Sequence, residues 1–292
     1  MVNFEKSPQI FLPENKTTQP ILPPELVQHV SIKRLQENIK NHPEMSRELT
    51  ELQKERIKKI KKVLMEIPLI HATSNETISQ GLADMKPTED LPNNHQGHSL
   101  ESDRSLGLTK CVFFGWGLPQ KGYGRFITKF SPELLDLENV FVTPMDIGHI
   151  EFADHKPFED FEEERKKRID EHYFSSMVTG RAWQEIMARR VLKHIEEGNP
   201  FFPLYDLYSM GEIKHYGKVP SQEFLGSFKT SDMREHYKYL YEHGFSFANM
   251  EQDNRLYRQT GKKYGVDPLY EECNIDYEEA SNFWKKTLNI SQ

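Results

Sequence analysis

Four short segments in the middle of the chain constrain its fold more than any other sequence feature. They are apolar or alternate between apolar and polar residues, and they span Pro68–His71, Cys111–Gly115, Arg125–Phe130 and Asn139–Thr143. Runs of this length, bounded by Gly, Pro, Asn or Ser, are typical of β-strands and too short for stable helices. Because helical periodicity precedes and follows them, the sequence predicts an α+β fold.

The rest of the chain divides into further extended and helical segments. Three downstream segments are predicted to be extended: residues 201–207, 212–216 and 223–228. Apolar residues recur at helical spacing over residues 25–66, 158–198 and 232–284. His42–Pro43 divides the first of these, and its second helix is predicted to begin near Ser46. Gly180 and Gly198 are predicted to mark helix ends in the second helical segment.

These patterns define four parts of the chain. Residues 1–23 are proline-rich and polar and are predicted to form a flexible arm. Residues 24–66 are predicted to form a helical N-terminal extension, and residues 67–230 are predicted to form the α+β core, with a helical insertion at about 158–198. Residues 231–292 form a helical C-terminal extension.

Composition excludes several classes of protein. Among 292 residues, 36% are hydrophobic, and no apolar run approaches the roughly 18 residues of a membrane-spanning helix. An aromatic share of 11% argues against general disorder, and two cysteines fit a reducing compartment. The N-terminus lacks the pattern of a secretory signal peptide. We therefore expect a cytoplasmic protein, or one secreted into a host cell by a route without such a signal.

The segment that follows the first predicted strand carries the strongest functional signal. It reads His71-Ala-Thr73-Ser74 and continues into a short helical stretch that contains Ile78 and ends at Gly81-Leu82. Alternation along the strand places His71 and Thr73 on one face. Ser74 is predicted to cap the following helix, and Leu82 is predicted to return the chain to the core.

This segment resembles the first strand and helix of the ADP-ribosyltransferase superfamily. A second match begins at Glu212, where the sequence Glu-Ile-Lys-His-Tyr-Gly-Lys-Val-Pro is similar to the late hairpin that carries the catalytic glutamate of the family. Between them, the sequence from Arg104 to Phe114 resembles the arginine-bearing segment and following strand of the DNA-modifying toxin branch. The resemblance implies an ADP-ribosyltransferase-like split β-sheet core with N-terminal, inserted and C-terminal helices.

The resemblance also implies a reaction and a set of site residues. NAD would be the substrate, nicotinamide would be released, and ADP-ribose would pass to a macromolecular acceptor. Glu212 and His71 would be catalytic, with His71 also binding a ribose hydroxyl. The residues implied in NAD binding are His71, Thr73, Ser74, Arg104, Phe113, Phe114 and Tyr123. Cleavage of the nicotinamide bond passes through a ribosyl cation, which a single carboxylate can stabilise.

Each assignment has a structural alternative. His71 fits a core histidine bonded to a carbonyl, Glu212 fits a carboxylate on an edge strand, and Arg104 fits an ordinary loop charge. Phe113 and Phe114 occupy adjacent positions and so face opposite sides of a strand, which leaves one of them for the core. They stand where one branch of the family has a tyrosine, so Tyr123 or a phenylalanine would stack on nicotinamide.

Other classes of site find less support in the sequence. The glycine-rich stretch from residue 115 to 124 lacks the G-x-G-x-x-G pattern of a Rossmann fold. His95 and His98 have no diagnostic metal-ligand spacing, and we predict no metal site.

Three hypotheses for function remain. The first is ADP-ribosylation of a protein, by a bacterial effector or toxin if the acidic stretch from Tyr270 to Ser281 is an export tail; an ordinary acidic helix is the alternative. The second is modification of nucleic acid, which requires a basic channel beside Glu212, formed by residues such as Lys110, Lys121, Arg125 and Lys129. The third is an inactive fold of this family that serves as a binding module. The net charge of -7 favours a protein acceptor over nucleic acid.

Overall fold

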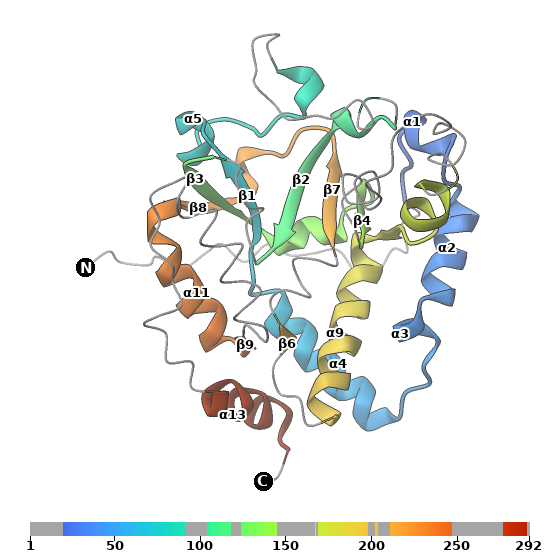
Figure 1. Cartoon of the computed structure of the whole chain (residues 1–292), viewed down its shortest axis with the longest axis vertical. Coiled ribbons are helices and arrows are strands. Elements are labelled where there is room, and N and C mark those ends of the chain that lie inside the picture. The colour runs from blue at the N-terminus through green and yellow to red at the C-terminus, as the bar shows by residue number, and fades with distance from the viewer. Residues whose placement is uncertain are drawn as a thin grey trace, which may run out of the picture.

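A computed structural model of the chain shows an α+β fold around one large antiparallel sheet (Figure 1). The structure describes residues 20–91, 104, 106–117, 124–144, 167, 169–197, 202–203, 211–246 and 277–290. Tyr123, most of the predicted N-terminal arm and the first part of the predicted helical insertion lie outside the described residues.

The sheet has seven strands in the order β5-β4-β7-β2-β1-β3-β8. Every neighbouring pair in it is antiparallel. Its strands are β1 (Leu69–Thr73), β2 (Cys111–Trp116), β3 (Phe126–Phe130), β4 (Val140–Thr143), β5 (Val178–Thr179), β7 (Glu212–Tyr216) and β8 (Phe224–Lys229). A separate parallel pair joins β6 (Phe202–Pro203) to β9 (Phe245–Ser246).

In the sequence, most of the α-helices precede β1, follow β8 or lie between β5 and β6. The α-helices are α1 (Pro24–Val27), α2 (Ile32–Asn41), α3 (Pro43–Ser46), α4 (Glu51–Leu64), α5 (Glu76–Ser79), α9 (Gly180–Glu196), α11 (Met233–Glu242) and α13 (Tyr277–Leu288). Short 3-10 helices span Thr88–Asp90, Leu108–Lys110, Pro132–Asp136, Ser221–Glu223 and Thr230–Asp232, and Ile169–Phe174 forms a π-type turn.

The sequence located the strands of the sheet well but misjudged how two of them pair. The four central segments and the segments at 212 and 223 are confirmed as strands within one or two residues. The predicted late hairpin is wrong, because β7 pairs with β2 and β4 while β8 pairs with β3 at the edge of the sheet. The turn at Gly217 therefore leads away to another part of the sheet.

Several local predictions are also corrected. The helix predicted to start near Ser46 is α4, which begins after Thr50, where Thr50 and Gln53 form a capping box. Gly180 opens α9 instead of ending a helix, since β5 interrupts the predicted insertion just before it.

The turn after β1 differs from the prediction in two details. Asn75 caps α5, accepting hydrogen bonds from the backbone N–H groups of Thr77 and Ile78, and Ser74 is exposed. Leu82 is 71% exposed and does not return to the core.

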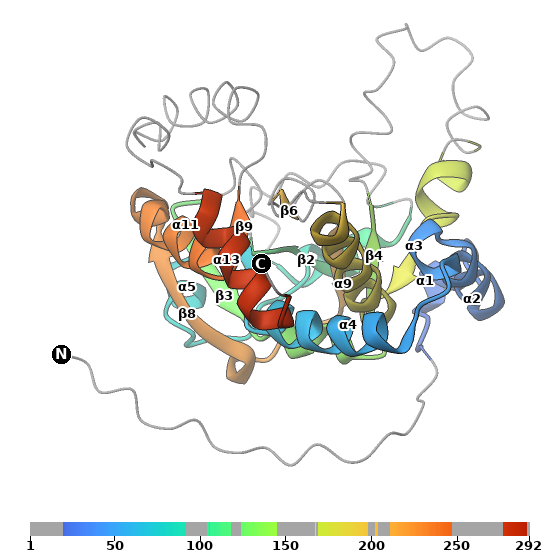
Figure 2. The ribbon, with the colours of Figure 1, turned by 90° about the horizontal axis from the view of Figure 1, so that it is seen from below.

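One face of the sheet packs on long helices. Apolar residues of α4 and α9 meet β2, β4 and β7 in the main core, which also includes Trp284 of α13 and Leu240 of α11. Figure 2 shows α4, α9 and α13 gathered on the side of the sheet seen from below. Side-chain packing in this hydrophobic core thus joins the predicted N-terminal extension, the predicted α+β core and the predicted C-terminal extension.

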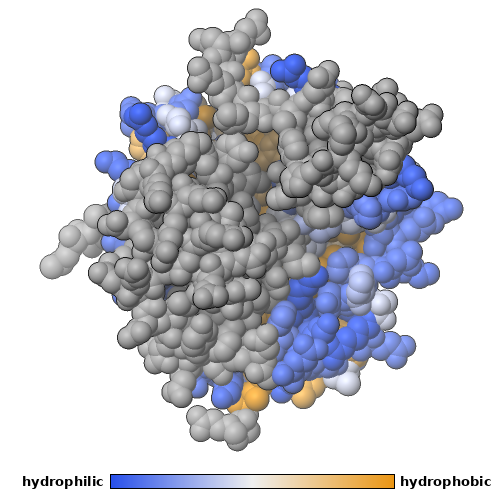
Figure 3. All heavy atoms as spheres, in the orientation of Figure 1, coloured by the Kyte–Doolittle hydropathy of each residue, from blue (hydrophilic) through white to orange (hydrophobic). Residues whose placement is uncertain are grey.

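The opposite face of β2, β4 and β7 is covered by a second cluster. This cluster joins α1, α2 and residues 169–177 to the outward side chains of these strands, including Cys111, Phe141 and Tyr216. The N-terminal helices lie beside this half of the sheet, at the opposite end from α11 (Figure 1). Their outer surface is mainly hydrophilic in the view of Figure 3. As a result, β7 is buried on both faces, and any polar side chain on it needs a partner.

Strands β1 and β2 part from each other after a very short ladder. They pair at Leu69–Trp116 and Ile70–Gly115, whereas β1 continues to pair with β3 as far as Thr73. The sheet therefore opens between β1 and β2 at His71. Within the described residues, no helix is long and apolar enough to cross a membrane.

Two glycines with positive φ allow a test of the turn that follows β1. Gly81 (φ 68°) and Gly217 (φ 88°) both adopt a backbone that costs an L-residue about 1–2 kcal/mol. A methyl group at Gly81 would also overlap the Phe224 ring, whereas a methyl group at Gly217 would have no other atom within 4 Å. We expect Gly81→Ala to lower the free energy of unfolding by about 1–3 kcal/mol more than Gly217→Ala does. Urea denaturation measures both; equal losses would show that Phe224 does not pack as described.

Candidate functional site

The first residue of β7 forms a buried ion pair with a lysine on the same face of the strand. The Oε2 atom of Glu212 lies 2.6 Å from Nζ of Lys214, and their side chains are 10% and 0% exposed. Lys214 Nζ also donates to Oγ1 of Thr143 at 2.5 Å and to the backbone carbonyl of Glu212 at 3.3 Å. Glu212 and Lys214 lie on one face because side chains alternate along a strand.

Two aromatic rings complete the surroundings of the lysine. Lys214 Nζ lies 5.0 Å from the ring centroid of Tyr173 and 5.9 Å from that of Phe113. A desolvated ammonium gains about 2 kcal/mol or more from such a face. The carboxylate, the hydroxyl and the rings together explain how a lysine is accommodated with no exposed surface.

Tyr173 is held as a neutral phenol in this cluster. Burial raises its pKa well above the ordinary value, and the negative charge of Glu212 acts in the same direction, while a polar contact with Thr143 opposes them. The ring therefore stays uncharged over the physiological pH range and presents a π-face to Lys214.

His71 projects into the opening between β1 and β2. Its Nδ1 lies 2.8 Å from the carbonyl oxygen of Phe113, and its ring meets that of Phe114 edge-on at 6.0 Å. Because a carbonyl can only accept, Nδ1 carries the proton and Nε2 carries the lone pair. Burial lowers the pKa of His71, against the opposing effect of the Phe113 carbonyl, so the ring is neutral at pH 7.

The other predicted site residues have varied surroundings. Thr73 accepts a hydrogen bond from the backbone N–H of Asn75 at 3.1 Å, so its hydroxyl supports the turn. Ser74 and Arg104 are exposed. Phe114 lies in the core at 1% exposure, and Phe113 is half-buried. This confirms that only one of the two adjacent rings is fully buried.

The predicted catalytic residues flank β2 at the same level of the sheet. Gly115 of β2 pairs with Ile70 of β1, and His71 is the residue after Ile70. Phe114 of β2 pairs with Ile213 of β7, and Glu212 is the residue before Ile213. Two strand spacings of about 4.8 Å separate their backbones. They approach β2 from opposite faces: His71 contacts the Phe114 ring, and the lysine partner of Glu212 contacts the Phe113 ring. Among the described contacts, none joins His71 directly to Glu212.

Three residues of this cluster were not predicted from the sequence: Lys214, Thr143 and Tyr173. The signal for Lys214 was present in the Glu-Ile-Lys order, which places a carboxylate and an ammonium on one strand face. Thr143 required the pairing of β4 with β7, and Tyr173 required the folding of the insertion onto the sheet, neither of which follows from local sequence.

Two surface hollows lie elsewhere on the described part of the molecule. One, of about 1010 Å³, runs between α4 and α9 and is lined mainly by charged residues such as Glu51, Lys58 and Arg189. The other, of about 360 Å³, lies beside α11 and includes Lys129, Phe228 and His236. Neither is lined by Glu212 or His71. Among the residues described, no group of three His, Cys, Asp or Glu side chains is arranged to hold a metal ion.

Comparison with known proteins adds no identity. No family model matches the chain, and no curated protein sequence is significantly similar to it.

The buried ion pair predicts a large effect from removing its cation. Lys214→Met leaves the Glu212 carboxylate buried without this partner, and we expect a loss of about 3–5 kcal/mol in the free energy of unfolding. The double variant with Glu212→Gln should lose less than Lys214→Met alone, because no buried charge remains. Lys54→Met, which breaks an exposed pair with Glu51, is the control and should leave the denaturation midpoint nearly unchanged. Similar losses from Lys214→Met and the double variant would contradict the ion pair.

Proposed function

We propose that the protein is an NAD-dependent ADP-ribosyltransferase that releases nicotinamide and transfers ADP-ribose to a macromolecular acceptor, with a protein as the preferred acceptor. The proposal rests on the resemblance of three separate segments to one family. One observation supports it above the others: strands β1, β2 and β7, which carry these segments, are neighbours at the centre of the sheet.

Glu212 has the surroundings that such a reaction needs in its carboxylate. It begins β7 at the level where β1 and β2 part, and its contact with Lys214 is an ion pair in which the carboxylate is charged. A fixed negative charge in a site of low water content stabilises a developing ribosyl cation far better than the same charge in water. The carboxylate is therefore charged before the nicotinamide bond lengthens, with Lys214 as its partner.

His71 has a protonation state suited to binding a ribose hydroxyl. Its neutral ring donates from Nδ1 to Phe113, which orients the ring and leaves the Nε2 lone pair as an acceptor for a hydroxyl proton. The hydroxyl of Thr128 also bonds the backbone carbonyl of His71 at 2.7 Å, so β3 helps to fix the strand that carries it. We assign His71 to cofactor positioning and Glu212 to stabilisation of the cation.

A protein acceptor fits the charge distribution better than nucleic acid does. Of the lysines and arginines proposed for a basic channel, Lys129 lies over the Phe228 ring, on the β3–β8 side of the sheet, away from Glu212. The cation described next to Glu212 is Lys214, which is buried and paired with it. With a net charge of -7, these positions favour a protein surface as the target.

A second candidate is a binding module that uses the same fold without catalysis. The 10% exposure of the Glu212 side chain and its ion pair with Lys214 favour this alternative. It predicts that neither the natural protein nor any site variant releases nicotinamide, and that a partner protein binds the helical extensions.

The test of the proposed function is nicotinamide release from NAD by the full chain, measured by chromatography. Glu212→Gln keeps the shape of the side chain and removes its charge, so we expect the rate to fall about 10²- to 10³-fold. Glu133→Gln, an exposed carboxylate before β4, is the matched control and should behave as the natural protein does.

Three results distinguish the candidates. A loss confined to Glu212→Gln supports the transferase, and mass spectrometry of labelled lysate proteins then identifies the acceptor. Equal rates in both variants would remove Glu212 from the mechanism. No release by the natural protein with any acceptor would favour the binding module.

A further inference from the structure

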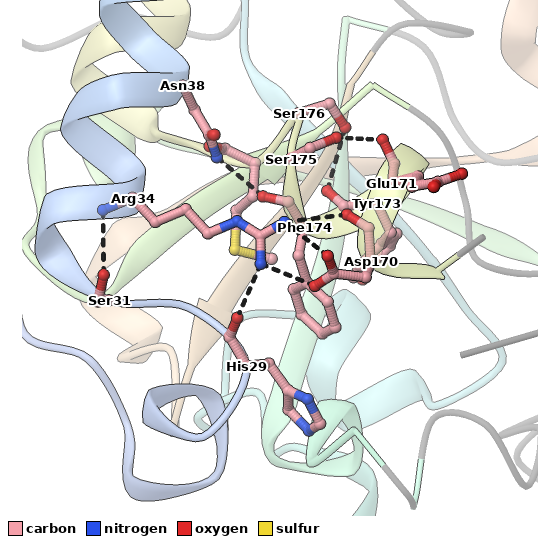
Figure 4. A network of polar contacts seen from close by, with 11 residues as sticks. His29, Ser31, Arg34, Asn38, Asp170, Glu171, Tyr173, Phe174, Ser175 and Ser176 are labelled. Atoms are coloured by element: carbon pink, nitrogen blue, oxygen red, sulfur yellow. Dashed lines mark hydrogen bonds and ion pairs between the residues drawn. The ribbon is translucent and has the colours of Figure 1, made fainter. Parts of the chain in front are cut away.

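Residues 169–177 are fastened to α2 by a bidentate ion pair. Nη1 of Arg34 lies 2.7 Å from Oδ1 of Asp170, and Nη2 donates to Oδ2 at 3.0 Å and to the Asp170 carbonyl at 3.1 Å. Figure 4 shows the Arg34 side chain reaching from α2 to Asp170. A planar guanidinium paired with both carboxylate oxygens fixes orientation as well as distance. This contact joins positions that are 136 residues apart in sequence.

Asn38 and His29 extend this attachment along the same segment. Asn38 Nδ2 donates to the carbonyl oxygens of Phe174 at 2.8 Å and Met177 at 2.9 Å. The His29 ring stacks on Phe174 with centroids 4.8 Å apart and planes within 3° (Figure 4). Contacts to two backbone carbonyls three residues apart restrict the path of the segment itself, not just one side chain. We call this set of contacts, made by His29, Arg34 and Asn38, the α2 clamp.

The clamped segment carries Tyr173 onto the Glu212–Lys214 pair. Tyr173 is fully buried in the cluster that covers β2, β4 and β7, and its ring lies 5.0 Å from Lys214 Nζ. Lys214 in turn lies 2.6 Å from Glu212. A continuous series of contacts therefore runs from α2 through Tyr173 and Lys214 to the candidate catalytic carboxylate.

We infer that Arg34, Asn38 and Tyr173 are positioning residues of the candidate site: the α2 clamp holds the Tyr173 ring against Lys214 and thereby fixes the Glu212 carboxylate. This inference rests on the proposed function for its catalytic consequence. Its structural part, that order at β7 depends on the α2 clamp, stands independently of the chemistry. It also gives the N-terminal helices, which lie outside the three family-like segments, a role at the site.

Contacts from several separate elements converge on Lys214, which indicates positioning and not general stability alone. The contacts of Lys214 come from four elements: β2, β4, residues 169–177 and β7 itself. Three of these elements are strands of one sheet, which hold each other through backbone hydrogen bonds. Residues 169–174 belong to none of the described strands, and the α2 clamp together with apolar packing in the second cluster places them. A displacement of about 1 Å in a catalytic group can cost about 10²-fold in rate.

The test compares Arg34→Gln with Arg47→Gln in the full chain. Arg47 makes an ion pair of 2.9 Å with Glu196 at α9, partly exposed like the Arg34 pair but remote from Glu212, and it is the matched control. Hydrogen exchange is followed at residues 169–177 and at β7, and nicotinamide release gives kcat and KM. For Arg34→Gln we expect exchange to rise about tenfold in both segments and kcat to fall about tenfold with KM within twofold. Arg47→Gln should change neither.

A second pair of variants tests the Tyr173 ring directly. Tyr173→Phe keeps the π-face and should retain exchange at β7 and kcat near the natural values, whereas Tyr173→Leu should reproduce Arg34→Gln. If Arg34→Gln does not fold, Arg34→Lys replaces it; the lysine keeps the charge without the planar fork, and a smaller change of the same kind is expected.

The outcomes separate this inference from the proposed function. Faster exchange at residues 169–177 with unchanged exchange at β7 would overturn the inference, whether or not the protein is an enzyme. Unchanged exchange in both segments would also overturn it. If the natural protein releases no nicotinamide, the proposed function fails, and coupled exchange in the two segments still supports the structural link.

Discussion

Burial of β7 on both faces is the constraint on which the rest of this site depends. With α4 and α9 on one side and residues 169–177 on the other, a strand that begins Glu-Ile-Lys has little solvent for its charges. Leaving either charge without a partner would cost several kcal/mol, so Glu212 and Lys214 pair at 2.6 Å, and Thr143 and two aromatic rings satisfy the lysine. The fold thus fixes a charged carboxylate at the centre of its sheet.

The sequence predicted those features whose cause is local. Strands β1, β2 and β4 are short, mainly apolar runs, and β3 alternates between apolar and polar residues. The opposite environments of Phe113 and Phe114 follow from strand alternation. Features that depend on distant pairing were missed. The turn at Gly217 suggested a hairpin, although β8 pairs with β3 across the sheet. The pairing of Lys214 with Glu212 was not predicted. Cap identity failed for a smaller reason, since Ser74 and Asn75 are adjacent and chemically equivalent as caps.

The arrangement of His71 and Glu212 limits how one substrate could contact both residues. The two residues flank β2 at one level of the sheet, where β1 and β2 separate, and approach it from opposite faces. The opening begins beyond the Ile70–Gly115 pair, and a ligand that contacts both residues would have to reach across β2. Under the proposed function the ligand would be NAD, with the ribose next to nicotinamide at the opening.

The central claim is that NAD binds at this opening, and a crystal structure of the full chain with a non-hydrolysable NAD analogue tests it most directly. The account predicts the nicotinamide ribose within hydrogen-bonding distance of both the Glu212 carboxylate and Nε2 of His71. An analogue bound in the hollow beside α11, or ordered anywhere away from Glu212, would contradict the assignment of the site.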